Sequence, residues 1–383
     1  MGQRKIIDFI QNRENDGLLR TLSVVEKYAP GKITVAGKEY INFSSNDYIG
    51  LAHHSELLNV IRDKGLNVYA SASSRLMTGT GLLHNELEIK TASFKNKEAA
   101  MVFNSGYQAN VGVISAMVGK GDAVFCDKLV HASIIDGSLL SGCKLYRFNH
   151  NDPAHLEYIL DKYRKKYDRA LLAIESIYSM DGDRAKLSEF ELIKEKYDLI
   201  GMVDEAHATG IFGKNGSGLV EEEGNTASWD IIMGTFSKAL GGFGAYIACD
   251  IITKKYLINT CRSYIYSTSL PFHVIASDIK SLDIIKEEPV RRKDLLEKSV
   301  FLRNNLKSIG LNVLGESQII PTVFKDAHKT LEISEKLKSK GHWVTAVRPP
   351  TVPGGTSRLR ISLNYDHSME NISDLVNAIK DCI

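Results

Sequence analysis

The sequence predicts an α/β protein with a mostly parallel central sheet, helices on both faces of that sheet, and a smaller α+β domain at the C-terminal end. Short apolar runs with little alternation recur along the middle of the chain, which is typical of strands buried on both faces. Helical patterns separate several of these runs, as in a sheet built from strand–helix–strand units. After about Ile275 this order gives way to charged helices and paired strands, which indicates a second domain.

The expected elements follow from these patterns in chain order. The apolar runs predicted as strands of the central sheet are Ala99–Phe103, Ala123–Cys126, Leu145–Phe148, Ala170–Ile174, Leu199–Val203, Ile231–Met233 and Ala245–Ala248. The helices predicted between them are Gln108–Val118, Pro153–Tyr167 and Ser188–Tyr197. In the C-terminal part the predicted helices and strands are Ile284–Ile309, Leu311–Leu314, Ile319–Phe324, Thr330–Lys340, Trp343–Val347, Arg358–Leu363 and Met369–Cys382.

Three parts are predicted along the chain. Residues 1–50 form an N-terminal arm, in which an amphipathic stretch at Ile6–Glu26 precedes two alternating runs at Lys32–Val35 and Glu39–Phe43. Residues 51–275 form the large α/β domain, and residues 276–383 form the small α+β domain.

Composition excludes several classes of protein. The 383 residues carry 48 Lys and Arg against 46 Asp and Glu, so the formal charge of +2 creates no global field for nucleic acid or an anionic membrane. Five cysteines without C-x-x-C spacing argue against a disulfide framework or a zinc site and fit a reducing compartment. The N-terminus lacks the apolar region of a signal peptide, and no run approaches the roughly 20 apolar residues that span a bilayer. We therefore expect a cytoplasmic protein without a nucleic-acid, membrane or metal partner.

Polar turns follow four of the predicted strands. These turns are Asn104-Ser105-Gly106-Tyr107-Gln108, Glu175-Ser176-Ile177-Tyr178-Ser179, Asp204-Glu205-Ala206-His207 and Gly234-Thr235-Phe236-Ser237-Lys238. Because the carboxyl ends of parallel strands meet at one edge of a sheet, these turns are expected to line a single ligand crevice.

Asp204 and Lys238 lie about one strand–helix–strand unit apart, so both could face that crevice. A carboxylate opposite a pyridinium nitrogen and an amine that bonds to an aldehyde are the two groups that a pyridoxal phosphate site needs. The helix that begins at Gly106 would supply backbone N–H groups for the phosphate, and Thr235 and Ser237 would supply hydroxyls. Taken alone, however, an aspartate at a strand end is more often a helix cap, and most lysines are simply solvated.

Other enzyme classes lack their required motifs. Asp204-Glu205-Ala206-His207 also spells a helicase signature, but a helicase needs a phosphate-binding loop of the form G-x-x-x-x-G-K-[ST]. The candidate loop at Gly119-Lys120 has Ile114 where the first glycine belongs and Gly121 after the lysine. Neither H-E-x-x-H nor G-x-S-x-G occurs, so metalloprotease and α/β-hydrolase interpretations lose their main support.

Five segments carry a resemblance to a known family: Asn42–Tyr48, Asp127–Ser133, Ser179–Asp183, Val203–His207 and Thr235–Lys238. Together they resemble the α-oxoamine synthases, a family of fold-type I pyridoxal phosphate enzymes, and the likeness runs from about Asp8 to the C-terminus. The resemblance implies an aminotransferase-like fold, in which residues 51–275 bind pyridoxal phosphate. It also implies a homodimer with its active site at the interface.

The resemblance implies roles for nine cofactor-binding residues. Lys238 would bind the cofactor aldehyde and later move the proton of the substrate Cα, while Asp204 would pair with the ring nitrogen. His131 would stack on the ring and also contact the substrate, which places it with Lys238 and Asp204 among the catalytic residues. The remaining cofactor-binding residues implied are Gly106, Tyr107, Ser179, His207, Thr235 and Thr268, the last of them reaching the phosphate across the dimer interface.

The resemblance also implies substrate-binding residues. Arg360 would bind the carboxylate of the amino acid, a task that suits a bidentate guanidinium. Arg20 and Thr351 match positions near the acyl substrate, and Asn46 would help to shape the pocket. For Arg20 the alternative is a solvated surface arginine on an amphipathic helix.

The expected reaction is a decarboxylative condensation of an amino acid with an acyl thioester. Ile265–Ser269 and especially Trp343–Pro353 are most similar to the branch of the family that joins L-alanine to a pimeloyl thioester in biotin biosynthesis. Glycine C-acetyltransferase, 5-aminolevulinate synthase and serine palmitoyltransferase activities stay open, as does the acyl carrier, either coenzyme A or a carrier protein. A catalytically silent partner subunit is the alternative from a different class, although such a subunit would lack the lysine that Lys238 supplies.

Overall fold

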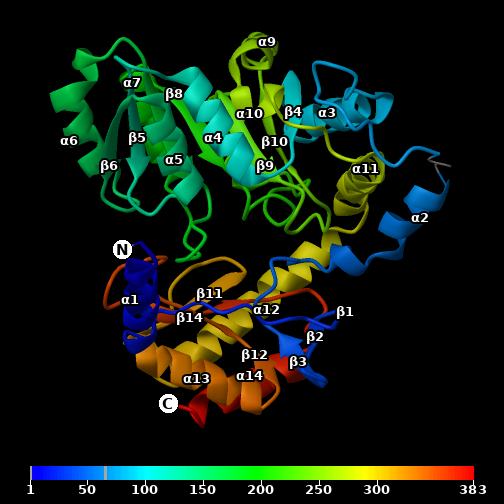
Figure 1. Cartoon of the computed structure of the whole chain (residues 1–383), viewed down its shortest axis with the longest axis vertical. Coiled ribbons are helices and arrows are strands. Elements are labelled where there is room, and N and C mark those ends of the chain that lie inside the picture. The colour runs from blue at the N-terminus through cyan, green and yellow to red at the C-terminus, as the bar shows by residue number, and fades with distance from the viewer. Residues whose placement is uncertain (1, 64–66) are drawn as a thin grey trace. The chain divides into compact units, whose positions relative to one another are not determined.

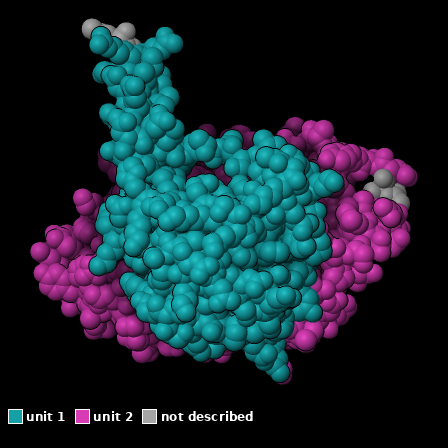
Figure 2. All heavy atoms as spheres, turned by 90° about the horizontal axis from the view of Figure 1, so that it is seen from below, with its two compact units in different colours: residues 1–50, 180–183, 293–383 teal, residues 51–179, 184–292 magenta. Residues whose placement is uncertain are grey.

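The computed structural model describes residues 2–63 and 67–383 (Figure 1). Residue 1 and residues 64–66, which belong to the predicted arm and large domain, lie outside this description. The chain divides into two compact units, which Figure 2 colours separately. We call residues 51–179 and 184–292 the large unit, and residues 1–50, 180–183 and 293–383 the small unit.

The large unit is built on a seven-stranded sheet whose strands are in the order β4-β10-β9-β8-β7-β5-β6. β10 runs antiparallel to both of its neighbours, and the other neighbouring strands run parallel. The strands are β4 (Ala99–Phe103), β5 (Ala123–Asp127), β6 (Lys144–Phe148), β7 (Ala170–Glu175), β8 (Ile200–Asp204), β9 (Ile231–Thr235) and β10 (Ala245–Cys249). Each coincides with a predicted strand to within two residues at either end. The mostly parallel sheet is thereby confirmed.

Helices lie on both faces of this sheet, as predicted (Figure 1). The helices of the large unit are η1 (Leu51–His53), α2 (Ser55–Asp63), α3 (Leu82–Phe94), α4 (Gly106–Met117), α5 (Ala132–Ser141), α6 (Pro153–Tyr163), η2 (Arg164–Lys166), α7 (Leu187–Lys196), α8 (Leu219–Glu222), α9 (Ile251–Thr260), α10 (Arg262–Ile265) and α11 (Phe272–Glu287). Helix starts follow local chemistry: the Ser105 hydroxyl accepts from the Gln108 N–H at 3.2 Å and caps α4, and Asp152 caps α6 just before Pro153.

The boundary between the units differs from the predicted one at residues 275 and 276. α11 lies in the large unit because its apolar face packs on α2 and α3. Ser277 also donates to the Leu57 carbonyl at 2.9 Å, and Lys90 forms an ion pair with Asp283 at 2.6 Å. The division therefore falls between Arg292 and Lys293, within α12 (Pro289–Ser308).

The small unit combines residues 1–50, predicted as a separate arm, with the C-terminal segment. One sheet has the order β1-β2-β3-β12, with β12 parallel to β3, and the other is antiparallel with the order β11-β14-β13. Its elements are α1 (Gly2–Asn15), β1 (Lys27–Ala29), β2 (Lys32–Val35), β3 (Lys38–Asn42), β11 (Ile319–Lys325), α13 (Ala327–Ser339), β12 (His342–Trp343), β13 (Thr345–Val347), β14 (Ser357–Ser362) and α14 (Met369–Lys380), with the greater part of α12.

Three local predictions for the small unit were wrong. The predicted strand Trp343–Val347 is divided between the two sheets, since β12 pairs with β3 whereas β13 pairs with β14. The run Leu311–Leu314 makes only an isolated bridge, between Val313 and Thr322. The amphipathic stretch expected to reach Glu26 stops at Asn15, because Gly17 adopts a φ of +64° and ends the helical backbone. Arg20 therefore lies beyond the helix.

Within residues 2–63 and 67–383, none of the helices is both long enough and apolar enough to span a bilayer.

Candidate active site

A cavity of about 340 Å³ opens where β4, β7, β8 and β9 end in the large unit. Such a volume suits a small ligand or cofactor. Its lining includes every predicted cofactor-binding residue except Ser179 and Thr268, and it adds residues that the sequence did not single out as ligands. The lining residues are Gly106, Tyr107, Asn110, His131, Glu175, Asp204, Ala206, His207, Met233, Thr235, Ser237 and Lys238.

One end of the cavity can hold an anion. Gly106 is the first residue of α4, so the N–H groups of the first turn have no partner within the helix. They lie at the positive end of the helix dipole. A Cβ at Gly106 would lie 2.8 Å from the Met233 Cε, and the backbone is exposed to the cavity because glycine has none. The Thr235 and Ser237 hydroxyls lie 2.6 Å apart on the loop after β9. This end of the cavity has the donors that a phosphate requires.

Asp204, the last residue of β8, is buried at another side of the cavity. Its Oδ1 accepts from the Ala206 N–H at 2.9 Å, and its Oδ2 accepts from the Asn110 Nδ2 at 2.9 Å. These two donors fix the orientation of the carboxylate. A carboxylate held in this way can stabilise a cation in the cavity.

Lys238 and His207 face one another across the same cavity, with the Lys238 Nζ 3.0 Å from the His207 Nε2. His131 begins α5, and its Nδ1 lies 2.7 Å from the Ser133 hydroxyl. Burial lowers the pKa of His131, and the Lys238 charge adds to this while Asp204 opposes it. The His131 ring is therefore mainly neutral near pH 7, as suits stacking on an aromatic ligand.

The Tyr107 hydroxyl is not available to bind an anion, because it donates to the Asp136 carboxylate. Hydrogen bonding to Asp136 raises the pKa of Tyr107. Its ring stands edge-on to that of His131, with centroids 6.1 Å apart. The predicted contribution of Tyr107 to the phosphate site therefore reduces to its backbone N–H.

Of the five predicted substrate-binding residues, His131 lies in the large unit and the other four lie in the small unit, in two groups. In the first, Arg360 of β14 is buried and donates to the Ser362 hydroxyl at 2.7 Å, to the Asn46 Oδ1 at 3.3 Å and to the Tyr48 hydroxyl at 3.3 Å. Arg358 lies on the same face of the strand, but it forms an ion pair with Asp181 at 2.7 Å.

The second group is formed by Arg20 and Thr351, whose Nη2 and Oγ1 atoms lie 2.7 Å apart. Both line a groove of about 580 Å³ together with apolar residues such as Trp343 and Val347. Arg348, which the sequence did not single out, also lines the groove and donates to the carbonyls of Gly17 and Leu19. The groove therefore offers apolar walls beside a guanidinium group.

Known proteins are similar to this chain in sequence and in fold. The family model for class I and II aminotransferases matches residues 38–379. The 8-amino-7-oxononanoate synthase of Geotalea daltonii is 42% identical over 367 residues, which cover 95% of this chain and 93% of that protein. The chain belongs to the class I and II aminotransferase family and, within it, to the α-oxoamine synthases.

Two solved structures agree with this assignment. The serine palmitoyltransferase of Sphingomonas wittichii superposes with a TM-score of 0.94 at 30% identity, covering 99% of this chain and 97% of that chain. A structure of a serine palmitoyltransferase with pyridoxal phosphate gives a TM-score of 0.92 at 29% identity, covering 99% and 96%. The α-oxoamine synthase described here is a pyridoxal phosphate-dependent acyltransferase. The cavity around Lys238 fits that cofactor, since it combines an amine, a fixed carboxylate and an anion-binding helix start.

Glu175 also lines this α-oxoamine synthase cavity, and no role was predicted for it, although it ends β7 as Asp204 ends β8. Its side chain is buried, and its two oxygens accept from the His131 N–H at 2.5 Å and from the Ser179 N–H at 3.1 Å. Ser179 does not line the cavity, but its N–H group donates to Glu175, which does. Burial, assisted by the charge of Asp204, raises the pKa of Glu175 to about 8.

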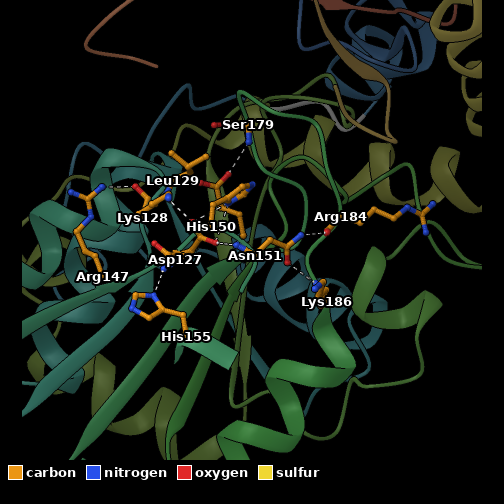
Figure 3. Close-up of polar contacts among 12 residues, drawn as sticks. Asp127, Lys128, Leu129, Arg147, His150, Asn151, His155, Ser179, Arg184 and Lys186 are labelled. Carbon is orange, nitrogen blue, oxygen red and sulfur yellow. Dashed lines mark hydrogen bonds and ion pairs between the residues drawn. The ribbon is translucent and has the colours of Figure 1, made fainter. Parts of the chain in front are cut away.

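The loop that leads from β5 to His131 is also held at its start (Figure 3). The buried Asp127 accepts from the Leu129 N–H at 2.7 Å and from the Asn151 N–H at 2.6 Å, and the His150 Nδ1 lies 3.1 Å from it. Asp127 and Glu175 thus fix the two ends of a short loop. This explains how the motif that begins at Asp127 places His131 reproducibly.

Replacing Glu175 by glutamine is expected to change how stability depends on pH. The pKa of Glu175 is about 8 in the folded protein, whereas the ordinary value is 4.5. Between these values the folded state keeps a proton that the unfolded state has lost, so the free energy of unfolding should fall by roughly 1.4 kcal/mol per pH unit as pH rises. Urea unfolding of the cofactor-free protein at pH 5.5, 6.5 and 7.5 should show this slope reduced in E175Q.

Glu195→Gln, at an exposed position, is the matched control and should keep the wild-type slope. Equal slopes in wild type and E175Q would contradict the raised pKa of Glu175.

Thr268 lies away from the Lys238 cavity within one chain. Its carbonyl accepts from the Asn104 Nδ2 at 2.9 Å, and its backbone forms a bridge with Ser74. Among the described residues, no group of three or more His, Cys, Asp or Glu side chains is arranged to hold a metal ion.

Proposed function

We propose that this enzyme condenses L-alanine with a pimeloyl thioester to give 8-amino-7-oxononanoate, carbon dioxide and the free thiol carrier, the reaction of 8-amino-7-oxononanoate synthase in biotin biosynthesis. The observation that carries the proposal is the sequence identity of 42% to a curated synthase of that name, against 30% to the serine palmitoyltransferase of Sphingomonas wittichii. The groove beside Arg20 and Thr351 supports it, because apolar walls with a guanidinium group suit an acyl chain that ends in a carboxylate.

Each residue then has a defined task in the proposal. Pyridoxal phosphate, when bound, withdraws electrons from the amino-acid Cα through its protonated ring. Lys238 holds the cofactor covalently and later carries the Cα proton on its Nζ. His207 can accept a proton from that Nζ across the observed 3.0 Å, which leaves the amine free to act as a base.

Binding and orientation fall to other residues. Gly106 and Thr235 would hold the cofactor phosphate, and Asp204 would face the ring nitrogen and stabilise its proton. Arg360, with Asn46 beside it, binds the substrate carboxylate until that group leaves as carbon dioxide. A new bond joins the substrate Cα to the acyl carbonyl carbon as the C–S bond breaks, and the Cα is finally reprotonated.

A homodimer with its active site at the interface and a cytoplasmic location complete the proposal. Exposed apolar side chains near the bridge between Ser74 and Thr268 support the dimer, since Met77 is 79% exposed and Leu82 is 91% exposed. The five free cysteines support a reducing compartment. Sedimentation velocity that finds only monomers at micromolar concentration would contradict the dimer.

A substrate matrix tests the proposed function. L-alanine, glycine and L-serine are each paired with pimeloyl-, acetyl-, succinyl- and palmitoyl-coenzyme A, and with pimeloyl-acyl carrier protein. L-alanine with a pimeloyl thioester is expected to give the highest kcat/KM, by at least about tenfold over other pairs. The measurement is thiol release together with mass spectrometry of the aminoketone. Turnover restricted to glycine with acetyl-coenzyme A would replace the proposal by a glycine C-acetyltransferase.

A further inference from the structure

A chain of hydrogen bonds links the Asp204 carboxylate to His131 through a residue that has no assigned task. The Asn110 Nδ2 donates both to the Asp204 Oδ2 at 2.9 Å and to the Ser133 hydroxyl at 3.0 Å. The Ser133 hydroxyl in turn lies 2.7 Å from the His131 Nδ1. The amide of Asn110 is thus the branching point between two of the proposed catalytic residues.

The amide of Asn110 lies in the cavity proposed to hold the cofactor, beside Asp204. Asn110 is four residues after Gly106 on α4, so both residues lie on the same face of the helix, about 6 Å apart along its axis. Gly106 lies at the anion-binding end of the cavity, and Asn110 lies beside Asp204. One rigid helix therefore serves both the phosphate end and the carboxylate side of the site.

The orientation of the amide is settled by its neighbour. An ionised carboxylate only accepts hydrogen bonds, so the nitrogen of Asn110, and not its oxygen, must face Asp204. The Oδ1 of Asn110 is buried and has no hydrogen-bond partner among the described residues. Leaving a buried acceptor without a partner costs free energy. The Asn110 side chain nevertheless keeps both hydrogen bonds that its nitrogen donates.

We propose that Asn110 is a positioning residue that holds the Asp204 carboxylate aimed at the ring nitrogen, and that couples this carboxylate to the orientation of His131 through Ser133. The inference rests on the proposed role of Asp204. The hydrogen bond of 2.9 Å from the Asn110 Nδ2 fixes the direction of the Asp204 carboxylate, and a carboxylate in a fixed direction is what can stabilise a protonated ring nitrogen.

The test compares two cofactors on the cofactor-free full-length protein. Pyridoxal phosphate and its 1-deaza analogue, in which a C–H group replaces the ring nitrogen, both bond to a lysine, but only the first can use Asp204. Asn110→Asp preserves the shape of the side chain and replaces the donor by a second carboxylate. We expect N110D to raise the Kd of pyridoxal phosphate at least tenfold and to change the Kd of the deaza analogue less than twofold. Absorbance titration gives both constants.

Two further variants keep the result interpretable. Asn110→Ala should show the same selective loss with a smaller amplitude, and it replaces N110D if that variant does not fold by circular dichroism. Ser133→Ala, which removes the other partner of Asn110 and leaves its contact with Asp204, should change the Kd of both cofactors by the same factor, because stacking on His131 does not depend on the ring nitrogen. An equal loss for both cofactors in N110D and N110A, or no loss for either, would overturn the inference.

The wild-type protein separates this inference from the proposed function. If wild type itself fails to prefer pyridoxal phosphate over the deaza analogue, the proposed role of Asp204 fails. If wild type shows the preference and N110D and N110A retain it, only the role of Asn110 fails.

Discussion

Replacing Lys238 by alanine is expected to lower kcat by at least about a thousandfold while the protein stays folded. The variant loses the amine that holds the cofactor and carries the Cα proton, and no second lysine lines the described cavity to replace it. Lys95 is also buried in the large unit, but its Nζ is held by Glu205 at 2.7 Å. Thiol release and carbon dioxide release measure the loss, and circular dichroism checks the fold.

Borohydride reduction gives an independent measurement on the wild-type protein. Reduction should fix a pyridoxyl group on the peptide that contains Lys238, and K238A should carry no label there. Lys255→Ala, at an exposed position on α9, is the matched control and should keep both activity and label. Label on a different lysine, or more than a tenth of wild-type kcat in K238A, would sink the assignment.

Most of the large unit could be predicted from the sequence because its strands are buried on both faces. Such strands appear as short uninterrupted apolar runs, and each predicted run became one strand of the sheet. The ends of those strands then indicated the site, since Asp204 directly follows one apolar run and Lys238 lies in the polar turn that follows another. The resemblance added His131 and His207, and the structure brings all four residues to one cavity.

Other features depend on contacts between residues that are distant in sequence. Asn110 appears in the sequence as a polar residue inside a helix, and only the fold shows that its amide meets Asp204. Glu175 could have been singled out by its place at the end of β7, but its task depends on the N–H groups of two loops. The small unit was harder to predict because its strands are short. Trp343–Val347 is divided between two sheets by the strands with which it pairs, and the local sequence pattern does not show this division.

The two acidic residues of the cavity illustrate why burial alone does not define a role. Asp204 accepts hydrogen bonds from Asn110 and Ala206 on its two oxygens, which fixes the direction of its carboxylate. Glu175 receives two backbone N–H groups, yet burial and the nearby negative charge of Asp204 raise its pKa to about 8. Near pH 7 Glu175 is therefore mainly protonated, and a protonated carboxyl group cannot stabilise a cationic ring as a carboxylate would.

Replacing Asp204 by asparagine is expected to lower kcat/KM by roughly a thousandfold, because a neutral amide cannot hold the proton on the cofactor ring nitrogen. The side chain keeps its shape, so the protein should fold, and the loss should be largest for the step that removes the Cα proton. Exchange of the Cα hydrogen of L-alanine with deuterated solvent, followed by NMR without acyl donor, isolates that step. Asp198→Asn, at a fully exposed position, is the matched control and should exchange at the wild-type rate.

D204N also makes a prediction about Glu175 that needs no cofactor. Since the charge of Asp204 is one cause of the raised pKa of Glu175, its removal should lower that pKa toward the ordinary value. The pH range over which the folded protein retains the Glu175 proton then narrows, and the loss of stability with rising pH ends at a lower pH than in wild type. D204N could instead show the wild-type dependence of unfolding free energy on pH and the wild-type rate of Cα hydrogen exchange in L-alanine. That result would mean that Asp204 is neutral in the folded protein. Its proposed role at the ring nitrogen would then be untenable.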